Sequence, residues 1–396
     1  MSQYKLPYVI ALLAILLPGC GGSDTENHNA AANIGSKSAS ASSFADNKNR
    51  EDSKAHKIEF TSQISFGDSL SDVGSYAVGT VAALGGGQFT VNSPGVQNWT
   101  AVMATQFGLP DPCAAQTGLD GDATQGFYVP VVNHDGCYGY AQGGARVTSP
   151  VGIGNKLTGG ANVTLGFLTV PVVQQIQNHL NANGGKFNDD DIVFVMAGAN
   201  DVFYQLGLLQ AAATDPTGAV TAMGLAASEL ATAINTKIIG NGARYIVVLN
   251  IPDIAITPLG ATFDAPTRGL VDAMVNTFNS QLKANVADST NVLYVDAYAD
   301  SYNQYVNPGA YGLSNVTNTA CDLSPAKNPL SSSLVCTNNN LNAGITGNYL
   351  FSDMVHPTPY GYNLIANLVS KEMIIHGWRW RKHKAREHGK EETDAH

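Results

Sequence analysis

A serine directly after a predicted strand is the first residue whose type and position suggest chemistry. Ser69 lies in the segment Phe66–Asp72 (FGDSLSD), which follows an apolar stretch. Open parallel sheets bind their ligands at the carboxyl ends of their strands, where this serine would stand. A neutral hydroxyl is a weak nucleophile, so Ser69 needs a base that takes its proton during attack.

His356 is the histidine best placed to act as that base. Asp353 precedes it by three residues in the segment DMVHP. One turn of chain can bring the Asp353 carboxylate against the imidazole, where it fixes the tautomer and stabilises the imidazolium. A structural role is the simplest explanation for the other histidines, which lie in the terminal segments, in a loop or beside a helix: His28, His56, His134, His179, His376, His383, His388 and His396.

Two further segments offer hydrogen-bond donors for a negatively charged oxygen. Asn200, in the segment GAND, follows an apolar run and can present its side-chain amide from the sheet edge. Gly143 and Gly144, in the segment YAQGGA, can present backbone N–H groups because no side chain blocks a close approach. One such donor is typically worth about 3 kcal/mol in the transition state of ester cleavage.

The elements that must position these residues alternate between strand and helix patterns. Residues 58–66, with Ile64 and Phe66 just before a glycine, predict the first strand, and short apolar runs predict buried parallel strands at 192–196, 245–249 and 292–295. Periodic apolar residues predict helices at 223–238 and 271–282, and Thr358 and Pro359 are the N-cap and first residue of a last helix that ends near 375. The alternation predicts an α/β domain over 58–376, with a parallel sheet covered on both faces.

Two long stretches, 80–165 and 297–350, break this alternation and are rich in Gly, Asn, Thr and Pro. Long irregular segments in compact domains are usually functional, so we expect walls or a lid over the site. Each stretch contains two of the four cysteines that remain once Cys20 is set aside. Four cysteines allow three pairings, and we favour Cys113–Cys137 and Cys321–Cys336 because each closes one local loop. A metal site fits poorly, since no C-x-x-C pair is present.

The N-terminal residues have the pattern of an export signal. The apolar stretch 6–17 is too short to span a bilayer and indicates a signal peptide over 1–19. The segment LPGC, ending at Cys20, resembles the lipobox of bacterial lipoproteins, in which the signal is cut before a lipidated cysteine. With Gly21 after it, this resemblance implies a lipoprotein of the outer membrane, or a protein at the cell surface or in the periplasm, of a Gram-negative bacterium. Secretion is the alternative.

The segments on either side of the domain differ from it in composition. Residues 20–57 are small and polar and predict a flexible tether behind the lipid anchor. Residues 377–396 are basic, with Trp378 and Trp380 at the junction, and predict a disordered tail or contact with an anionic membrane surface. The net charge of −10 over 396 residues argues against a nucleic-acid partner, because phosphate binding needs clustered Lys and Arg.

Taken together, these segments resemble the GDSL-type lipases and esterases of the SGNH hydrolase superfamily, from about residue 60 to 376. The four marks of the family appear here as Ser69, Gly144, Asn200 and the pair Asp353 and His356. The resemblance implies a three-layer α/β/α, flavodoxin-like fold with a central five-stranded parallel sheet and long loop insertions. It also implies that the serine is acylated and then hydrolysed, with no metal or other cofactor, and its spacing favours Gly144 over Gly143 as the donor.

The residues favour a serine carboxylester hydrolase and leave its substrate open. A phospholipase or acyltransferase and a carbohydrate acetylesterase are alternatives, because water and an alcohol compete for the same acyl-enzyme and the polar loops suit a carbohydrate ester. A non-catalytic surface lipoprotein on the same fold is an alternative of another class, because a fold does not determine a function. The sequence contains no G-x-S-x-G motif of the conventional α/β-hydrolases. Nothing in it indicates an oligomeric state.

Overall fold

A computed structural model describes residues 57–286 and 290–383. Its central sheet has four parallel strands within these residues, in the order β1-β4-β5-β6. They are β1 (Ser62–Gly67), β4 (Asp191–Met196), β5 (Tyr245–Leu249) and β6 (Val292–Val295). The apolar runs therefore predicted β4, β5 and β6 to within a residue. The first strand begins at Ser62 rather than at residue 58, because Ile58 pairs with Trp380 instead of with the sheet.

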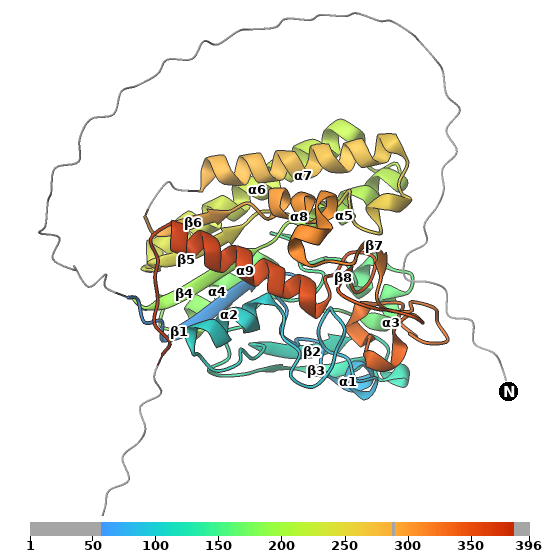
Figure 1. Cartoon of the computed structure of the whole chain (residues 1–396), viewed down its shortest axis with the longest axis horizontal. Coiled ribbons are helices and arrows are strands. Elements are labelled where there is room, and N and C mark those ends of the chain that lie inside the picture. Colours follow the sequence, from blue (N-terminus) through green and yellow to red (C-terminus); the bar gives the residue numbers. More distant parts are fainter. Residues whose placement is uncertain (1–56, 287–289, 384–396) are drawn as a thin grey trace, which may run out of the picture. The chain divides into compact units, whose positions relative to one another are not determined.

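Helices cover both faces of this sheet, as predicted for an α/β fold (Figure 1). One face packs against α4 (Val172–Ala182), α5 (Ala199–Gln210), α6 (Pro216–Ala233) and α7 (Ala265–Asn285). The other face packs against α2 (Trp99–Phe107) and α9 (Pro359–Ile375). Alternate residues of one strand serve the two cores: Val193 of β4 lies in the first and Phe194 in the second. Apolar cores cover both faces, which is why β4, β5 and β6 are nearly continuous hydrophobic runs in the sequence.

The position of the expected fifth strand is occupied by a short segment, Tyr138–Tyr140, beside β1. The Ser65 N–H donates to the Tyr138 carbonyl (3.0 Å), and the Tyr140 N–H donates to the Ser65 carbonyl (2.8 Å). These bonds form a single parallel bridge rather than a strand. The prediction of five strands is thus one too many for the described residues, although the segment lies where the flavodoxin-like order 2-1-3-4-5 places its second strand.

The two stretches that break the alternation contain more regular structure than predicted. The first holds α1 (Gly79–Ala83), α2, the hairpin β2 (Gln116–Asp120) and β3 (Tyr128–Asn133), and α3 (Asn162–Leu165). The second holds α8 (Ala297–Val306) and the parallel pair β7 (Asn315–Thr319) and β8 (Tyr349–Phe351). Both favoured disulfides, Cys113–Cys137 and Cys321–Cys336, are present, so the predicted pairing is confirmed.

One helical run resembles a membrane span by composition alone. Residues Pro216–Asn241 are long and apolar enough to cross a bilayer. Met223, Ala227 and Leu230 on this run are buried in the core, on the stripe that the sequence predicts. The run therefore behaves as the core helix of a packed domain, which passes the same test of length and hydropathy.

The chain remains in contact with the domain beyond the predicted boundary at residue 376. The Ile58 N–H donates to the Arg379 carbonyl (2.8 Å), and the Arg381 N–H donates to the Ile58 carbonyl (2.9 Å). Trp378 is buried against Tyr245, and Trp380 packs edge-on against Phe107. The prediction of a disordered tail is therefore wrong for residues 377–383, because the two indole rings bury apolar surface against the domain.

The predicted signal peptide, Cys20 and nearly all of the tether lie outside the described residues, as do residues 384–396.

Candidate active site

Ser69 lies in the turn that follows β1, at the carboxyl end of the sheet. Gln175 of α4 fixes the end of the strand, because the Gly67 N–H donates to Gln175 Oε1 (2.9 Å) and Gln175 Nε2 donates to the Gly67 carbonyl (2.8 Å). The sequence predicts a strand-to-helix turn here. The chain instead runs through successive turns until α1 begins at Gly79.

The structure brings Ser69, His356 and Asp353 into one line of hydrogen bonds. Ser69 Oγ lies 2.9 Å from His356 Nε2, and His356 Nδ1 lies 2.9 Å from both carboxylate oxygens of Asp353. Because a carboxylate only accepts, Nδ1 carries the ring proton and donates it to Asp353. Nε2 is then the acceptor for the Ser69 hydroxyl. The ring of Phe89 lies 4.9 Å from the imidazole, centroid to centroid, and covers it.

The Asp353 carboxylate is buried and yet held in its charged form. Burial alone raises its pKa. The charge of the nearby His356, its ring N–H, the Ser333 side chain and the backbone N–H of Val355 oppose burial and together hold the pKa of Asp353 well below its usual range. A charged carboxylate at this position can orient the imidazole and stabilise its protonated form.

Gly144 has a backbone conformation that excludes other residues. Its φ is +79°, and a Cβ atom built on it would stand 1.9 Å from the carbonyl oxygen of Ile153. The neighbouring Gly143 N–H is already used, since it donates to Asp72 Oδ2 (2.9 Å). Within the described residues the Gly144 N–H has no acceptor. Gly144 rather than Gly143 therefore offers a free donor, in agreement with the choice made from spacing.

Asn200 lies in the first turn of α5 and reaches across to the glycine segment. Its Nδ2 donates to the carbonyl of Ala145 (2.9 Å), which uses one of its two amide hydrogens. The next residue, Asp201, accepts from Arg146 Nε (2.9 Å) and from the Val147 N–H (3.0 Å). Both side chains therefore hold the segment 145–147 against the start of the helix.

A third free donor is the backbone N–H of Ser69, which sequence reasoning missed. It has no acceptor within the described part of the chain. The Gln142 N–H donates to the Gly67 carbonyl (3.2 Å), so the serine turn and the glycine segment are tied together, and Asn200 is tied to the latter through Ala145. These bonds link the three loops that carry the Ser69 N–H, the Gly144 N–H and the Asn200 amide.

The same span of sequence matches a known family. Residues 64–369 match the family described as GDSL-like lipase/acylhydrolase, and this span includes Ser69, Gly144, Asn200, Asp353 and His356. The chain belongs to this family.

Among curated relatives of this GDSL chain are the esterases EstA of Pseudomonas aeruginosa and Pseudomonas putida. Each is 31% identical to it over 140 residues, which are 32% of this chain and 19% of the relative. The chain thus matches about a fifth of the length of these relatives.

Solved structures similar to this GDSL chain include a member of the lipolytic G-D-S-L family from Veillonella parvula, at 14% identity. That match covers 78% of this chain and 96% of the other, with a TM-score of 0.36. An acetylxylan esterase from Geobacillus stearothermophilus is 15% identical, with 83% of this chain and 100% of the other covered and a TM-score of 0.36.

Two acidic residues of the GDSL segment have surroundings that the sequence did not indicate. Asp72 is buried and accepts hydrogen bonds from the backbone N–H groups of Gly74 (2.9 Å), Ser75 (2.7 Å) and Gly143. Asp68, directly before Ser69, is also buried, and burial raises the pKa of Asp68 to about 7. The Leu70 N–H and the charge of His356 oppose that rise.

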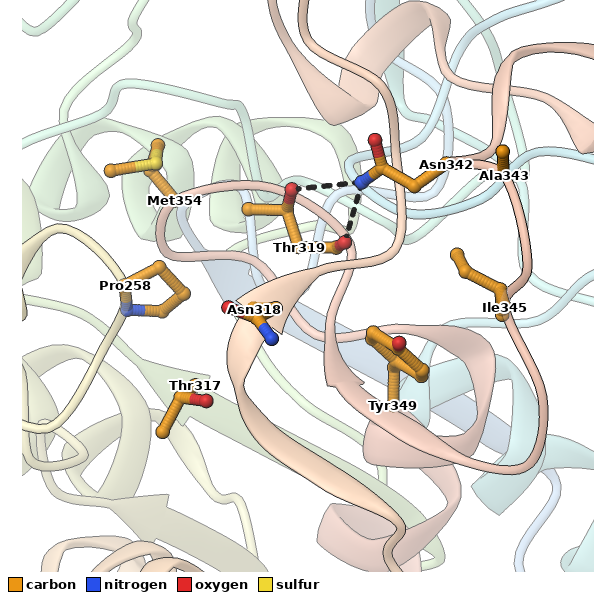
Figure 2. A pocket seen from close by; sticks show the side chains of 9 residues that line it. All are labelled: Pro258, Thr317, Asn318, Thr319, Asn342, Ala343, Ile345, Tyr349 and Met354. Atoms are coloured by element: carbon orange, nitrogen blue, oxygen red, sulfur yellow. Dashed lines mark hydrogen bonds between the residues drawn. The ribbon is translucent and has the colours of Figure 1, made fainter.

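An open pocket lies on one side of the turn that carries His356. Its volume is about 430 Å³, and Met354, between Asp353 and His356 in sequence, lines it together with Pro258. Figure 2 shows these two side chains on one side of the pocket and Ala343 and Ile345 on the other. The remaining lining is polar or aromatic and comes from the second insertion: Thr317, Asn318, Thr319, Asn342 and Tyr349.

Proposed function

We propose that this chain hydrolyses carboxylic esters, with Ser69 as nucleophile, His356 as general base and Asp353 as the group that orients the imidazole. The observation that carries the proposal is the 2.9 Å contact between Ser69 Oγ and His356 Nε2, made by residues far apart in sequence. Membership of the GDSL-like lipase/acylhydrolase family supports it. A nucleophile and a base within hydrogen-bond reach, with the base held by a third group, are the arrangement that acyl transfer needs.

The chemistry follows in two steps. Ser69 Oγ bonds to the ester carbonyl carbon as its proton passes to His356 Nε2, and the carbonyl oxygen becomes an oxyanion. The N–H groups of Ser69 and Gly144 and the amide of Asn200 are the donors proposed to stabilise that oxyanion. The carbon–alkoxy bond then breaks, and His356 protonates the leaving alcohol.

Water completes the cycle by the same route. His356 takes a proton from water, whose oxygen bonds to the acyl carbon. The bond to Ser69 Oγ breaks, and the serine recovers its proton as the acid leaves. No step in this sequence requires a metal or an organic cofactor.

A fluorophosphonate probe tests the proposal, because it reacts with an activated serine. We expect it to label the wild-type chain and to leave Ser69→Ala and His356→Ala unlabelled, with all three proteins folded by circular dichroism. Absence of labelling in the folded wild type would favour a non-catalytic surface protein instead.

We infer further that the alcohol part of the ester is polar and rich in hydroxyl groups. The pocket beside Met354 supports this choice among the substrates that the sequence leaves open. It presents the amide of Asn318 and the hydroxyls of Thr317 and Tyr349, and a carbohydrate offers matching donors and acceptors.

Two matched substrates test this inference. For an acetylated oligosaccharide, Asn318→Ala and Tyr349→Ala should raise KM several-fold. For p-nitrophenyl acetate, which has no sugar, KM should stay as in wild type. Faster hydrolysis of phospholipid vesicles than of the acetylated oligosaccharide, with no effect of either variant, would favour a phospholipase or a lipid acyltransferase.

The two disulfides agree with a protein that folds outside the reducing cytoplasm. We propose in addition that Cys20 is lipidated and anchors the chain at the outer membrane. The support is the LPGC segment at the end of an apolar signal. Metabolic labelling with a tagged fatty acid should mark the wild type and not Cys20→Ala.

A further inference from the structure

The Asp353 carboxylate takes hydrogen bonds from two different segments. Its Oδ1 accepts the N–H groups of Val355 (3.0 Å) and His356 (2.8 Å), which belong to its own turn. Its Oδ2 accepts the Ser333 N–H (2.8 Å), from 20 residues earlier in the chain. Within the described residues, Ser333 is the one backbone donor to this carboxylate from outside that turn. A bond between a buried N–H and a charged acceptor is strong and directional, so it helps to set which way the carboxylate faces.

Ser333 is held by its backbone rather than by its side chain. Its Oγ is buried and has no hydrogen-bond partner. Its carbonyl accepts the Cys336 N–H (3.0 Å) and the side-chain amide of Asn92 (3.1 Å). The preceding Ser332 exchanges two hydrogen bonds with the buried Asn328. The Ser333 side chain also lowers the pKa of Asp353, but the bond that Ser333 makes to the carboxylate is donated by its backbone N–H.

The Cys321–Cys336 disulfide links the Ser333 turn to Cys321, which is hydrogen-bonded to the segment that carries Asp353. Cys336 follows Ser333 by three residues, in the turn that presents the donor. The Cys321 N–H donates to the carbonyl of Ser352 (2.9 Å), the residue directly before Asp353. The turn that carries the donor is therefore tied to the residue before the acceptor by two successive links, the disulfide and the Cys321–Ser352 hydrogen bond.

We propose that Ser333 is a positioning residue, whose N–H orients the Asp353 carboxylate toward His356, and that the Cys321–Cys336 disulfide maintains this contact. The inference rests on the ester hydrolysis proposed above and assigns a catalytic requirement to the insertion 297–350. Without the Ser333 N–H, the carboxylate can turn. The His356 ring then directs Nε2 at the Ser69 hydroxyl in a smaller fraction of the molecules. The result is a lower kcat. KM for a small ester changes little, because the groups that bind the ester are untouched.

Proline and alanine at position 333 separate the N–H from the side chain. Ser333 is the first residue of a 3-10 turn, where proline is favoured, and Ser332 has the extended ψ of 147° that a residue before proline prefers. Ser333→Pro removes the N–H, whereas Ser333→Ala keeps it. We expect kcat for p-nitrophenyl acetate to be about 10- to 100-fold lower in Ser333→Pro than in Ser333→Ala, with similar KM. Equal kcat in two folded variants would overturn the inference.

The other disulfide provides a matched control that does not depend on a proline variant folding. Cys321→Ser/Cys336→Ser opens a loop with a sequence separation of 15, and Cys113→Ser/Cys137→Ser opens one of 24. Loop entropy makes the second pair at least as destabilising as the first. We expect kcat to fall several-fold more for the first pair, measured well below both unfolding midpoints. Equal losses would show that the disulfide at 321 and 336 contributes stability alone.

The two proposals can fail separately. If the folded wild type hydrolyses no ester and takes no fluorophosphonate, the proposed function fails. If the wild type is active, Ser333→Pro matches Ser333→Ala and the two disulfide variants match each other, then the positioning role fails while the proposed function stands.

Discussion

The carboxylate of Asp72 accepts the backbone N–H of Gly143 at 2.9 Å, and this bond joins the turn that carries Ser69 to the segment that carries Gly144. The same carboxylate accepts the N–H groups of Gly74 and Ser75. Burial raises the pKa of Asp72, and hydrogen bonds from Ser75, Gly74 and Gly143 oppose that rise. Asp72 thus helps to hold two loops of the proposed site together.

Asp72→Ala should lower both stability and turnover. It leaves the Gly143 N–H buried and unpaired, which typically costs about 1–3 kcal/mol of unfolding free energy, and it lets Gly144 move away from Ser69. Urea unfolding and kcat for p-nitrophenyl acetate measure the two effects. Asp264→Ala is the control: it removes the exposed N-cap of α7 and should lower stability by about 1 kcal/mol while kcat stays unchanged. A kcat equal in the two variants would argue against a role for Asp72 in positioning the loops.

Gly144→Ala should reduce kcat, because the new Cβ meets the Ile153 carbonyl at 1.9 Å and must displace the N–H proposed to bind the oxyanion. Gly95→Ala separates this contact from backbone strain. Gly95 has a similar φ of +76°, yet nothing lies within 4 Å of a Cβ built on it. It should lose about 1–2 kcal/mol of stability from its left-handed backbone and keep its activity. Thermal unfolding and kcat of both variants provide the comparison.

Asn200→Ala should lower kcat by about 100- to 1000-fold, as expected when one oxyanion donor is lost. The Ala145 carbonyl also loses its partner, so the unfolding free energy should fall by about 1 kcal/mol. The measurement is kcat for p-nitrophenyl acetate at a temperature where the variant is folded. Unchanged turnover would remove Asn200 from the proposed site.

His179 should make stability depend on pH in the acid range. Burial lowers the pKa of His179 from 6.5 to about 4, and its Nε2 has no hydrogen-bond partner. The rings of Phe66, Tyr140 and Phe187 surround it. The contribution of neutral His179 to the unfolding free energy is complete above pH 6.5 and is lost as pH falls toward 4. In this range the imidazole is protonated in the unfolded chain but not in the folded chain. The full loss of unfolding free energy from this titration is about 3 kcal/mol.

His179→Phe keeps an aromatic ring there and removes the titration. Urea unfolding at pH 7 and at pH 4.5 gives the loss of stability for each protein. The wild type should lose about 2–3 kcal/mol more than the variant over this interval. The same loss in both would mean that His179 is protonated in the folded chain.

The parts of the fold with strong local patterns could be predicted from the sequence. Continuous apolar runs gave β4, β5 and β6, and Thr358 with Pro359 marked the start of α9, where the Thr358 side chain accepts the Gly361 N–H. The segment that takes the place of the fifth strand has no such pattern. It centres on Gly139, which lies against the backbone of Cys113, so its pairing with β1 depends on tertiary contacts alone.

In the candidate site, too, some residues could be predicted from the sequence and others could not. Ser69, Gly144, Asn200, Asp353 and His356 are recognisable because side-chain type, or glycine itself, is what each position requires. The groups that support them were not recognisable. Ser333 acts through a backbone N–H that any residue except proline provides, and Phe89 covers His356 with a ring that resembles many core rings in sequence. A role carried by the backbone or by ordinary packing leaves little signal in residue type.

The pairing of Ile58 with residues 379–381 brings the two ends of the domain together beside the amino end of β1 (Figure 1). Ser69 stands at the opposite, carboxyl end of the same strand. A solid support attached at residue 57 or at residue 383 would therefore lie at the opposite end of β1 from Ser69 and would leave the nucleophile facing away from the support. The adjacency of the ends also makes the domain suited to circular permutation or to insertion as a cassette into a host protein.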